Sequence, residues 1–165
     1  MTPIIRAETD DHFVAARALF EEYAASLGID LCFQNFDEEL KTLARQYGTP
    51  DGCLLLASEA DQAIGCVALR RLDADGCEMK RLYVKPPFRH LKIGKLLVAT
   101  IIEEATRLGY SGVRLDTLPS MTTAQKLYSG FGFRQIAPYC FNPIPGTIFM
   151  ELQLPNGDST FSARS

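Results

Sequence analysis

The chain has 165 residues, which is long enough for one compact domain with its own core and short for two. Its 47% hydrophobic and 22% charged residues are ordinary for a globular protein, and its net charge of −3 argues against a general nucleic-acid binder. The first residues do not resemble a signal peptide, and no apolar run approaches the length of a membrane span. We therefore expect a cytoplasmic protein whose partners include no nucleic acid and no membrane.

The cysteines point to packing rather than chemistry. They form no C-x-x-C pair and have no metal-like spacing to either histidine. Three of them lie in apolar or strand-like runs, where cysteine is usually a small buried hydrophobe. We expect no catalytic cysteine and no metal site from this set, which comprises Cys32, Cys53, Cys66, Cys77 and Cys140.

The first third of the chain is predicted to be mainly helical. Residues 3–7 form a candidate first strand, and Thr9 then caps a helix that Gly28 ends. A second, shorter helix is predicted from Asp37 through Ala44. The loop residues 47–52 follow.

After this loop the hydrophobic pattern changes to that of strands. Residues 53–57, 63–69 and 77–84 are apolar runs joined by short polar turns, which predicts an antiparallel meander. A helix follows, with an apolar stripe at Leu97, Ile101, Ala105 and Leu108 that Val98 and Ile102 widen. Residues 113–117 then form a strand that can lie parallel to residues 77–84, because a helix connects the two.

The last part of the domain adds a helix over residues 119–129 and a strand over residues 147–154 with one buried side. The predicted order is β-α-α-β-β-β-α-β-α-β-β, an α/β class with a mixed (α+β) sheet. We expect a single domain over residues 3–154 and a flexible C-terminal tail over residues 155–165.

One stretch predicts an anion site. A strand ends near Val84, a short turn runs from Arg89 to Gly94, and a long amphipathic helix follows. Amides in the first turn of a helix have no partner inside it, and the helix dipole favours negative charge there. Six basic residues are close in sequence here, and they either serve this site or form solvated surface: Lys80, Arg81, Lys85, Arg89, Lys92 and Lys95.

Residues 78–96 resemble the acetyl-CoA signature of the GNAT superfamily of N-acetyltransferases. The resemblance rests on the strand end Leu82-Tyr83-Val84-Lys85-Pro86 and on the beginning of the helix, Arg89-x-x-Lys92-x-Gly94. A second stretch, Ala124 to Phe133, is similar to the family pattern Ala-x-x-Leu-Tyr-x-x-x-Gly-Phe. The two motifs stand in the right order, and the element order agrees from Pro3 to Leu154. The resemblance implies the GNAT-like acyl-CoA N-acyltransferase fold and acetyl-CoA as the acetyl donor.

The resemblance also implies which residues bind the donor. The backbone of the strand end would meet the pantetheine and the thioester carbonyl, and the turn would hold the pyrophosphate. Lys92 departs from the family, which usually has its first glycine there, so its ammonium either meets a phosphate or points to solvent. Met121 stands where many members carry an asparagine, and Thr122 or Thr123 could replace that contact. The implied coenzyme-binding residues are Leu82, Tyr83, Val84, Arg89, His90, Leu91, Lys92, Ile93, Gly94 and Lys95.

Acetyl transfer to an amine needs a base for the amine, donors for the oxyanion and an acid for the thiolate. The resemblance implies Tyr128 as the acid, since a phenol with a pKa of about 10 stays protonated at neutral pH; the alternative is a packing tyrosine. It implies Glu78 as the base, often through water, and the alternative is an ion pair with Lys80 or another basic residue. By strand alternation Glu78 shares a face with Lys80, Leu82 and Val84. Asp116 and His90 are weaker candidates, which we interpret as structural or exposed.

The acceptor is an amine of unknown identity, on a small molecule or a protein. Tyr23, Phe33, Asp37, Tyr139 and Asn142 could line its pocket, and the proline-rich residues 138–146 form a stiff loop that could shape it. The last strand could pair with another subunit, which makes a homodimer possible. Two alternatives to the enzyme remain: a non-catalytic acyl-CoA sensor of the same fold, and an unrelated nucleotide-binding protein, for which the Walker and G-x-G-x-x-G motifs are missing.

Overall fold

The computed structural model of the chain describes residues 2–28 and 35–155. Cys32, Phe33 and the tail from residue 156 onward lie outside these residues. Within the described residues, no helix combines the length and the apolar composition that a membrane span requires.

The chain divides into two compact units. The first consists of Met1–Arg70 and Met79–Glu104, and the second of Arg71–Glu78 and Ala105–Ser165. The strand β4 contributes to both units, because the division falls after its third residue. The single domain of residues 3–154 therefore stays a prediction.

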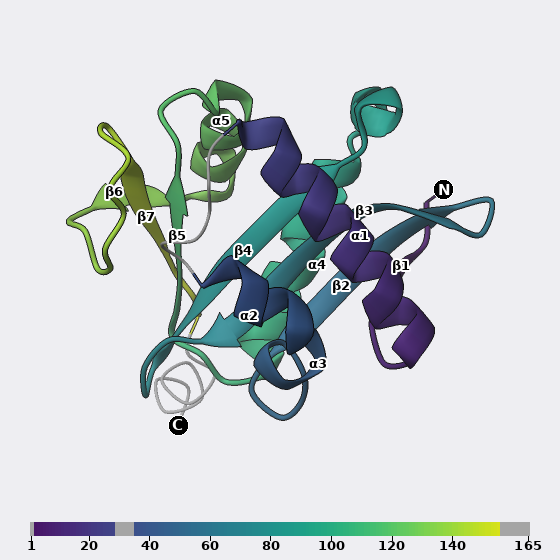
Figure 1. The fold of residues 1–165 in the computed structure, drawn as a ribbon. Coiled ribbons are helices and arrows are strands. Elements are labelled where there is room, and N and C mark those ends of the chain that lie inside the picture. Colours follow the sequence, from purple (N-terminus) through teal and green to yellow (C-terminus); the bar gives the residue numbers. More distant parts are fainter. Residues whose placement is uncertain (1, 29–34, 156–165) are drawn as a thin grey trace. The chain divides into compact units, whose positions relative to one another are not determined.

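Helices and strands follow one another in nearly the predicted order (Figure 1). Strand pairing gives a mixed seven-stranded sheet with the order β1-β2-β3-β4-β5-β7-β6, which confirms the predicted α/β class. The elements are β1 (Ile4–Arg6), α1 (Asp10–Leu27), α2 (Phe36–Lys41), α3 (Leu43–Gln46), β2 (Cys53–Glu59), β3 (Gln62–Arg71), β4 (Gly76–Val84), the 3-10 helix η2 (Pro86–Leu91), α4 (Ile93–Arg107), β5 (Gly112–Thr117), α5 (Thr122–Phe131), β6 (Arg134–Ile136) and β7 (Ile148–Gln153).

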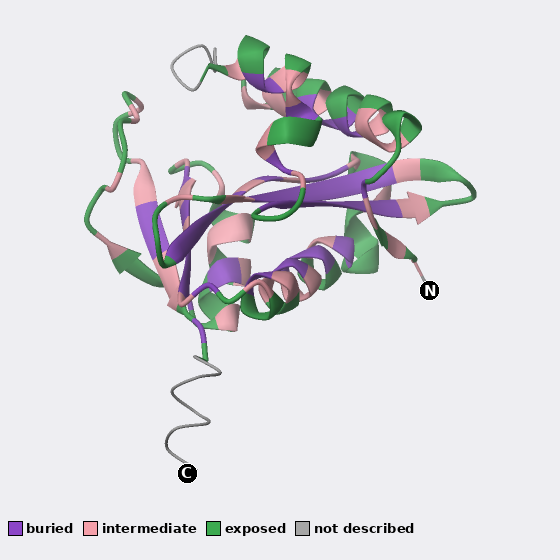
Figure 2. Cartoon of the chain, turned by 90° about the horizontal axis from the view of Figure 1, so that it is seen from below, coloured by how far each residue is buried: buried purple, intermediate pink, exposed green. Residues whose placement is uncertain are grey.

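In the first unit the strands form a layer with helices on both faces (Figures 1 and 2). The helices α1, α2 and α3 lie on one face of β2, β3 and β4, and α4 lies on the other. β2 pairs antiparallel with β3, as the meander predicts. Because both faces are covered, these strands have continuous apolar runs instead of alternating polar residues.

The core below α1 joins Leu19 and Phe20 of the helix to every second residue of the strands, such as Leu54, Leu56 and Cys66. The ring of Phe20 meets that of Tyr47 edge to face at 6.0 Å between centroids. This cluster holds the first helix on the sheet.

On the opposite face α4 approaches the sheet closely. Its residues Leu97, Val98 and Ile101 are fully buried, which confirms that part of the predicted stripe. A Cβ on Gly65 of β3 would lie 3.2 Å from Cδ1 of Leu97 and 3.1 Å from the carbonyl oxygen of Tyr83. Glycine at this position is therefore what permits the short distance between helix and strand.

In the second unit, β4 pairs parallel with β5 from Gly76 to Glu78, as predicted for two strands connected by a helix. β7 pairs antiparallel with both β5 and β6. The predicted single buried side of β7 is wrong, because the neighbours Phe149 and Met150 are both buried. Successive strand residues point to opposite faces, so both faces of β7 are covered there.

The beginning of α1 confirms the predicted cap and shows a partner that the sequence did not reveal. The Thr9 hydroxyl accepts a hydrogen bond from the His12 amide at 3.2 Å, and His12 Nδ1 accepts one from the Thr9 amide at 3.2 Å. This reciprocal arrangement is a capping box with histidine in the place of the usual glutamate. Gly28 ends the helix in the left-handed conformation at φ 66°, as predicted.

The predicted helix from Asp37 to Ala44 is wrong in extent, because the chain breaks it at Thr42 (φ −131°, ψ 31°). The Thr42 hydroxyl donates to the Glu38 carbonyl at 2.8 Å and accepts from Nε2 of Gln46 at 2.8 Å. Such local bonds compete with regular helix geometry. Two short helices, α2 and α3, replace the predicted one.

The helix predicted over residues 119–129 is shifted toward the C-terminus. Residues 118–121 form a turn, in which the Met121 amide donates to the Leu118 carbonyl at 3.0 Å. The helix ends at Gly132, which is left-handed at φ 102°, and Gly130 lies inside it. Both glycines suit a helix end, and the backbone conformation selects the second one.

A buried ion pair joins β4 to α2. The guanidinium of Arg81 donates two hydrogen bonds to the Glu39 carboxylate, at 2.9 Å from Nε and 2.6 Å from Nη2, and both side chains are 4% exposed. The hydroxyl of Tyr47 donates a further bond to Glu39 at 2.9 Å. Removing charges from water is costly, and here the bidentate geometry with a third donor offsets that cost.

Arg81 also has an unusual backbone. Its φ is 63° within β4, a left-handed conformation that costs residues with a Cβ about 1–2 kcal/mol. This conformation interrupts the alternation that the sequence predicts for Glu78, Lys80, Leu82 and Val84. The strand is therefore irregular at the residue that carries the buried charge.

Replacing Glu39 by Gln should lower the free energy of unfolding by about 3 kcal/mol, because Arg81 then stays buried without an opposing charge. Urea denaturation measures this change. Glu38→Gln is the matched control, since its contact with Arg45 at 3.8 Å is exposed and should contribute less than about 0.5 kcal/mol. Equal losses in the two variants would contradict a stabilising role for the pair.

The same pair predicts a pH dependence of stability. Burial raises the pKa of Glu39, but the hydrogen bond and charge of Arg81, with Tyr47, outweigh burial and hold this pKa below its ordinary value of 4.5. Because the folded-state pKa is below the unfolded-state value, the stabilisation is complete above pH 4.5 and is lost as the pH falls through the folded-state pKa. The difference in unfolding free energy between wild type and Glu39→Gln should therefore shrink below pH 4.5.

Candidate functional site

The turn after β4 has the strand, turn and helix arrangement that the sequence predicts. The 3-10 helix η2 leads to Lys92, and α4 begins at Ile93. The Leu96 amide donates to the Lys92 carbonyl, and so closes the first turn of the helix. The amides of residues 93–95 precede this bond and have no acceptor within α4. They can bind an anion, and the positive end of the helix dipole favours one.

Lys92 adopts the backbone conformation that glycine favours. Its φ is 60° and its ψ is 28°, in the left-handed region, and its side chain is exposed. The motif that this stretch resembles has glycine at this position, because glycine adopts the left-handed conformation without the steric cost of a Cβ. The chain therefore keeps the turn with a residue whose Cβ is strained in this conformation.

Arg89 is held at the end of β4. Its Nε donates to the Val84 carbonyl at 2.8 Å, and its guanidinium lies over the Tyr83 ring at 5.6 Å from the centroid. These contacts use Nε and one face of the guanidinium. The terminal nitrogens can still donate to an anion, so Arg89 fits the predicted binding role. One lone pair of the Val84 carbonyl, which the sequence assigns to pantetheine, is engaged by this bond.

Glu22 of α1 takes part in this region, and sequence reasoning missed it. Its carboxylate accepts from Lys85 Nζ at 2.8 Å and from the Tyr83 hydroxyl at 3.3 Å. Burial, followed by the charge of Glu22, raises the pKa of the Tyr83 phenol. The sequence separation of 61 residues between Tyr83 and Glu22 left no spacing signal that could have revealed the contact.

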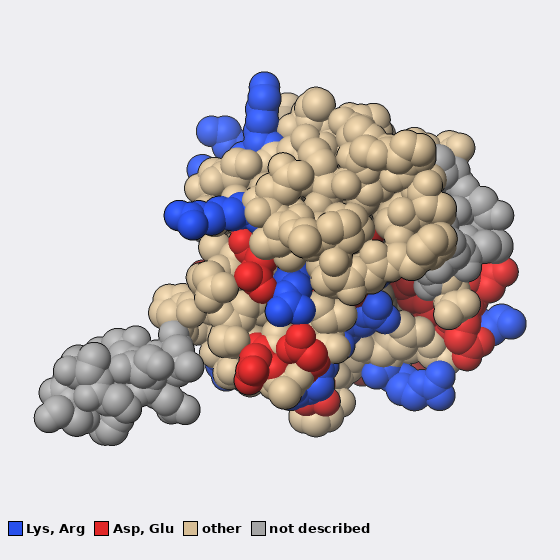
Figure 3. Space-filling view, turned by 90° about the vertical axis from the view of Figure 1, so that its left-hand side faces the viewer, with Lys and Arg blue, Asp and Glu red and all other residues tan. Residues whose placement is uncertain are grey.

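The basic cluster does not act as one surface. Arg81 is buried on Glu39, Lys85 is paired with Glu22, and Arg89 is fixed at the strand end. The interpretation as solvated surface is therefore wrong for Arg81. On the face drawn in Figure 3, Lys and Arg side chains lie among Asp and Glu rather than in a continuous basic patch.

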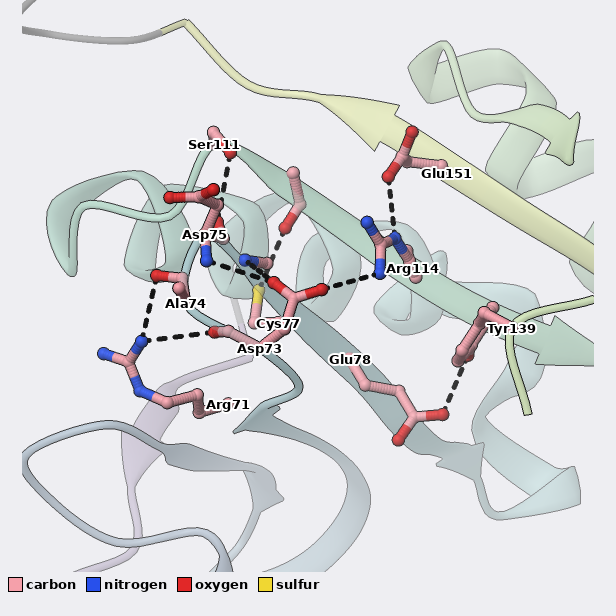
Figure 4. A network of polar contacts seen from close by, with 12 residues as sticks. Arg71, Asp73, Ala74, Asp75, Cys77, Glu78, Ser111, Arg114, Tyr139 and Glu151 are labelled. Atoms are coloured by element: carbon pink, nitrogen blue, oxygen red, sulfur yellow. Dashed lines mark hydrogen bonds and ion pairs between the residues drawn. The ribbon is translucent and has the colours of Figure 1, made fainter.

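Glu78, the predicted base, lies in the second unit and is 2% exposed. The Tyr139 hydroxyl donates to its Oε2 at 2.8 Å (Figure 4). Burial, followed by the negative charges of Glu78 and Asp116, raises the pKa of the Tyr139 phenol far above its ordinary value. The structure thus brings a candidate base and a candidate acceptor-lining residue into direct contact.

Asp116 and Asn142 are also brought together. Asn142 Nδ2 donates to Asp116 Oδ2 at 3.1 Å, and Asn142 Oδ1 accepts from the Ile144 amide at 2.9 Å. Residues 137–147 lack regular secondary structure, as the prolines predict. This loop is anchored at two points, Tyr139 and Asn142. Asp116 has a structural partner, in agreement with its interpretation as structural.

Tyr128, the predicted acid, lies in α5 of the second unit and is 7% exposed. Its carbonyl accepts from the Phe133 amide at 3.1 Å, while the Gly132 amide donates to Ser129. The rings of Tyr128 and Phe133 are 5.7 Å apart. These contacts form a Schellman motif with its hydrophobic pair. Tyr128 therefore packs the end of α5 through its ring and its carbonyl, and neither contact involves its hydroxyl.

The turn before α5 contains Met121, which stands where the resembled motif often has an asparagine. Met121 Sδ accepts from the Thr117 hydroxyl at 3.7 Å, and Gln125 Nε2 donates to the Leu118 carbonyl at 2.7 Å. Met121, the N-cap residue of α5, makes no side-chain hydrogen bond that caps the helix. The residues Thr122 and Thr123 therefore stay candidates for the missing contact.

The cysteines of the apolar runs are buried, as predicted. Cys53, Cys66 and Cys77 are fully buried. Burial raises the pKa of the Cys66 thiol, and it raises that of Cys77 to about 12, so both stay protonated. In the described part of the chain, no three His, Cys, Asp or Glu side chains are grouped so that they could hold a metal ion.

Known proteins resemble this chain in both sequence and fold. A sequence model described as "Acetyltransferase (GNAT) family" matches residues 16–133. An uncharacterized N-acetyltransferase of Schizosaccharomyces pombe is 47% identical over 140 residues, covering 84% of this chain and 86% of that protein. A GNAT-family acetyltransferase structure from Staphylococcus aureus Mu50 has a TM-score of 0.78 at 24% identity, covering 94% of this chain and 100% of that one. An N-acetyltransferase of Thermoplasma acidophilum, solved with coenzyme A, has a TM-score of 0.69 at 21% identity, covering 93% and 99%.

The strain at Lys92 can be measured by comparing two substitutions that remove the same charge. Lys92→Gly relieves the left-handed strain, whereas Lys92→Ala retains a Cβ. Glycine also gives the unfolded chain more freedom, which offsets part of this gain. We expect the unfolding free energy of Lys92→Gly to exceed that of Lys92→Ala by about 0.5–1 kcal/mol. Thermal and urea unfolding measure the difference. Equal stability, or a more stable alanine variant, would show that the turn imposes no strain.

Proposed function

Because the chain belongs to the acetyltransferase (GNAT) family and is an N-acetyltransferase, we propose that it transfers an acetyl group from acetyl-CoA to a primary amine of a small molecule or a protein. The observation that carries this proposal is the turn after β4. There the motif residues combine a strand end, a left-handed Lys92 and the N-terminus of α4. The coenzyme A complex of the Thermoplasma relative supports a coenzyme A thioester as the donor.

The pyrophosphate of the donor would bind at the beginning of α4. The amides of residues 93–95 supply hydrogen-bond donors, and the helix dipole adds a fixed partial charge. Arg89 and Lys92 add full charges on the same turn, and Arg89 is already oriented by Val84 and Tyr83. His90 and Leu91 belong to η2, which leads the chain into this turn.

The pantetheine and the thioester would lie along the backbone of residues 82–84. Tyr83 and Val84 are buried through their side chains, which is compatible with a binding role because the backbone groups point elsewhere. Backbone amides aimed at the carbonyl oxygen would stabilise the negative charge of the tetrahedral intermediate.

The reaction is a direct attack. The neutral amine adds to the thioester carbon, the intermediate collapses, and the carbon–sulfur bond breaks. Glu78 takes the proton that the amine nitrogen loses, directly or through water, and Tyr128 gives a proton to the departing thiolate. The phenol has a pKa of about 10 and the thiol a pKa of about 8.5. Proton transfer from the phenol to the thiolate is therefore unfavourable by a small free energy only, and the phenol can serve as the acid.

The second candidate function is an acyl-CoA sensor without turnover. It is favoured by the departures at Lys92 and Met121, which both concern the coenzyme site. The enzyme is favoured because Tyr128 and Glu78 are both retained at the motif positions. Binding and turnover must therefore be measured separately.

The role of Lys92 in donor binding can be tested by calorimetry with coenzyme A. If the ammonium meets a phosphate, Lys92→Ala should weaken binding about threefold to tenfold, Lys92→Arg should retain most of the affinity, and the difference should decrease in high salt. Equal affinity of wild type and Lys92→Ala at low salt would place this side chain in solvent and leave the backbone site intact.

The enzymatic role is tested with purified protein, acetyl-CoA and a panel of amines: diamines, amino alcohols, amino acids and lysine-containing peptides. Free thiol release measures turnover. We expect Tyr128→Phe to lower kcat by roughly a hundredfold, because it removes the proposed acid and preserves the ring contact with Phe133. Tyr110→Phe is the matched control, a buried tyrosine of the same unit that should retain activity.

Each other outcome has a distinct meaning. Coenzyme A binding without turnover on any amine would favour the sensor. Failure to bind any coenzyme A species would contradict the proposed function itself. A Tyr128→Phe variant as fast as wild type would remove Tyr128 from the acid role and leave the family assignment unaffected.

A further inference from the structure

One face of the sheet in the second unit carries a row of charged side chains. Glu78 of β4 is aligned with Arg114 of β5, and Arg114 is aligned with Glu151 of β7. Asp116, two residues after Arg114, is aligned with Phe149. Aligned residues of neighbouring strands, and residues two apart along a strand, point to the same face. These five side chains therefore share one surface.

Arg114, the positive charge in this row, binds two carboxylates. Arg114 Nε donates to Glu151 at 2.8 Å, and Nη1 donates to Asp73 at 3.0 Å (Figure 4). The hydrogen bond to Glu151 raises the pKa of Arg114 further, so it stays charged. In Figure 4 this guanidinium is joined to Asp73 and Glu151, whereas the Glu78 carboxylate is joined to Tyr139.

Tyr139 covers the Glu78 end of this surface. Its hydroxyl donates to Oε2 of Glu78 at 2.8 Å, and its ring meets Phe149 edge to face, with centroids 5.4 Å apart and planes at 81°. Burial, then Glu78 and Asp116, raises the phenol pKa, which keeps the hydroxyl protonated. Tyr139 is therefore a permanent donor, and a hydrogen bond to a carboxylate is among the stronger ones.

The loop that carries Tyr139 is fixed at a second point. Asn142 binds Asp116 on the same face, and the Ile144 amide binds Asn142 in turn. The ring contact with Phe149 and the bond of Asn142, three residues later, hold the part of the loop that carries the phenol.

We propose that Tyr139 is a positioning residue of the acetyl transfer: its hydroxyl donates to the Glu78 carboxylate and holds it in one orientation, ready to take the proton of the acceptor amine. This inference rests on the proposed function, in which Glu78 is the base. Tyr139 itself exchanges no proton and touches Glu78 rather than the reacting atoms. The proton moves from the amine nitrogen to Glu78.

This role predicts a change in the pH dependence of the reaction. In the described part of the chain, the charged and titratable groups near the contact include Asp116 of β5 and Cys140 of the loop, which act on Tyr139, together with Arg114 of β5, aligned with Glu78, and Glu151 of β7, aligned with Arg114. Tyr139→Phe retains the ring on Phe149 and removes only the donor to the carboxylate. Losing such a donor favours the protonated form of a carboxyl group. The acidic limb of the activity profile should therefore move to higher pH.

The kinetic test uses acetyl-CoA and the amine of the panel that reacts fastest. Tyr139→Phe should lower kcat about tenfold, with an unchanged KM for acetyl-CoA and an acidic limb shifted upward. Tyr110→Phe, another buried tyrosine of this unit, should change none of these. In the Glu78→Gln background, Tyr139→Phe should have no further effect on kcat, because it acts through the carboxylate that is gone.

A second measurement needs no amine. Protein with ¹³C-labelled glutamate carboxyls is titrated by NMR, and the Glu78 signal is identified by its loss in Glu78→Gln. Its half-titration should occur at a higher pH in Tyr139→Phe than in wild type. Thermal unfolding checks that the phenylalanine variant is folded.

The outcomes separate the two claims. If Glu78→Gln is slow but Tyr139→Phe matches wild type in kcat, pH profile and carboxyl titration, the positioning role is overturned. If Tyr139→Phe alters only the KM for the amine or the preference among amines, the residue is a wall of the acceptor pocket, and the proposal is also overturned. If Glu78→Gln is as fast as wild type, the base assignment of the proposed function fails first.

Discussion

The buried pair of Arg81 and Glu39 is the constraint on which the first unit depends. A guanidinium and a carboxylate that are each 4% exposed stabilise the fold only when they meet, and here they meet with two bonds and a third from Tyr47. The pair connects β4 to α2 and α3 and holds Arg81 in a left-handed conformation inside a strand. Such strain persists only where the surroundings over-determine it. The irregular middle of β4 is thus a consequence of buried charge.

The irregular strand carries different chemistry on each side of Arg81. Before it, Glu78 lies in the part of β4 that pairs with β5 and binds Tyr139. After it, residues 82–84 lead into the turn where, in the proposed function, Arg89, Lys92 and the beginning of α4 would bind the pyrophosphate. Lys92, like Arg81, has a positive φ, a backbone conformation that glycine adopts more easily than a residue with a Cβ. In both places the chain accepts backbone strain next to residues that the proposed reaction uses.

Sequence patterns predicted the fold well where the signal is local. The caps Thr9 and Gly28 bound α1 as expected, and the helix stripe at Leu97 and Ile101 is buried. The patterns failed where a tertiary contact decides. Thr42 breaks the predicted helix through its own hydroxyl, so that Glu39 lies in α2 and Tyr47, which follows α3, donates to the Glu39 carboxylate. The end of α5 at Gly132 rather than Gly130 depends on the contact between Phe133 and Tyr128.

The sequence by itself determined the family, the order of the elements and the turn that would hold the pyrophosphate, because these depend on residues close together in the chain. Only the tertiary structure decided the partners of the charged groups. Tyr139 is 61 residues from Glu78, and Arg81 is 42 residues from Glu39. Residue spacing along the chain could therefore predict neither hydrogen bond. Whether a basic residue faces solvent, a phosphate or a buried carboxylate depends on which distant segment folds against it. A periodic pattern shows that a residue is buried, but it does not contain the identity of the group that satisfies its charge.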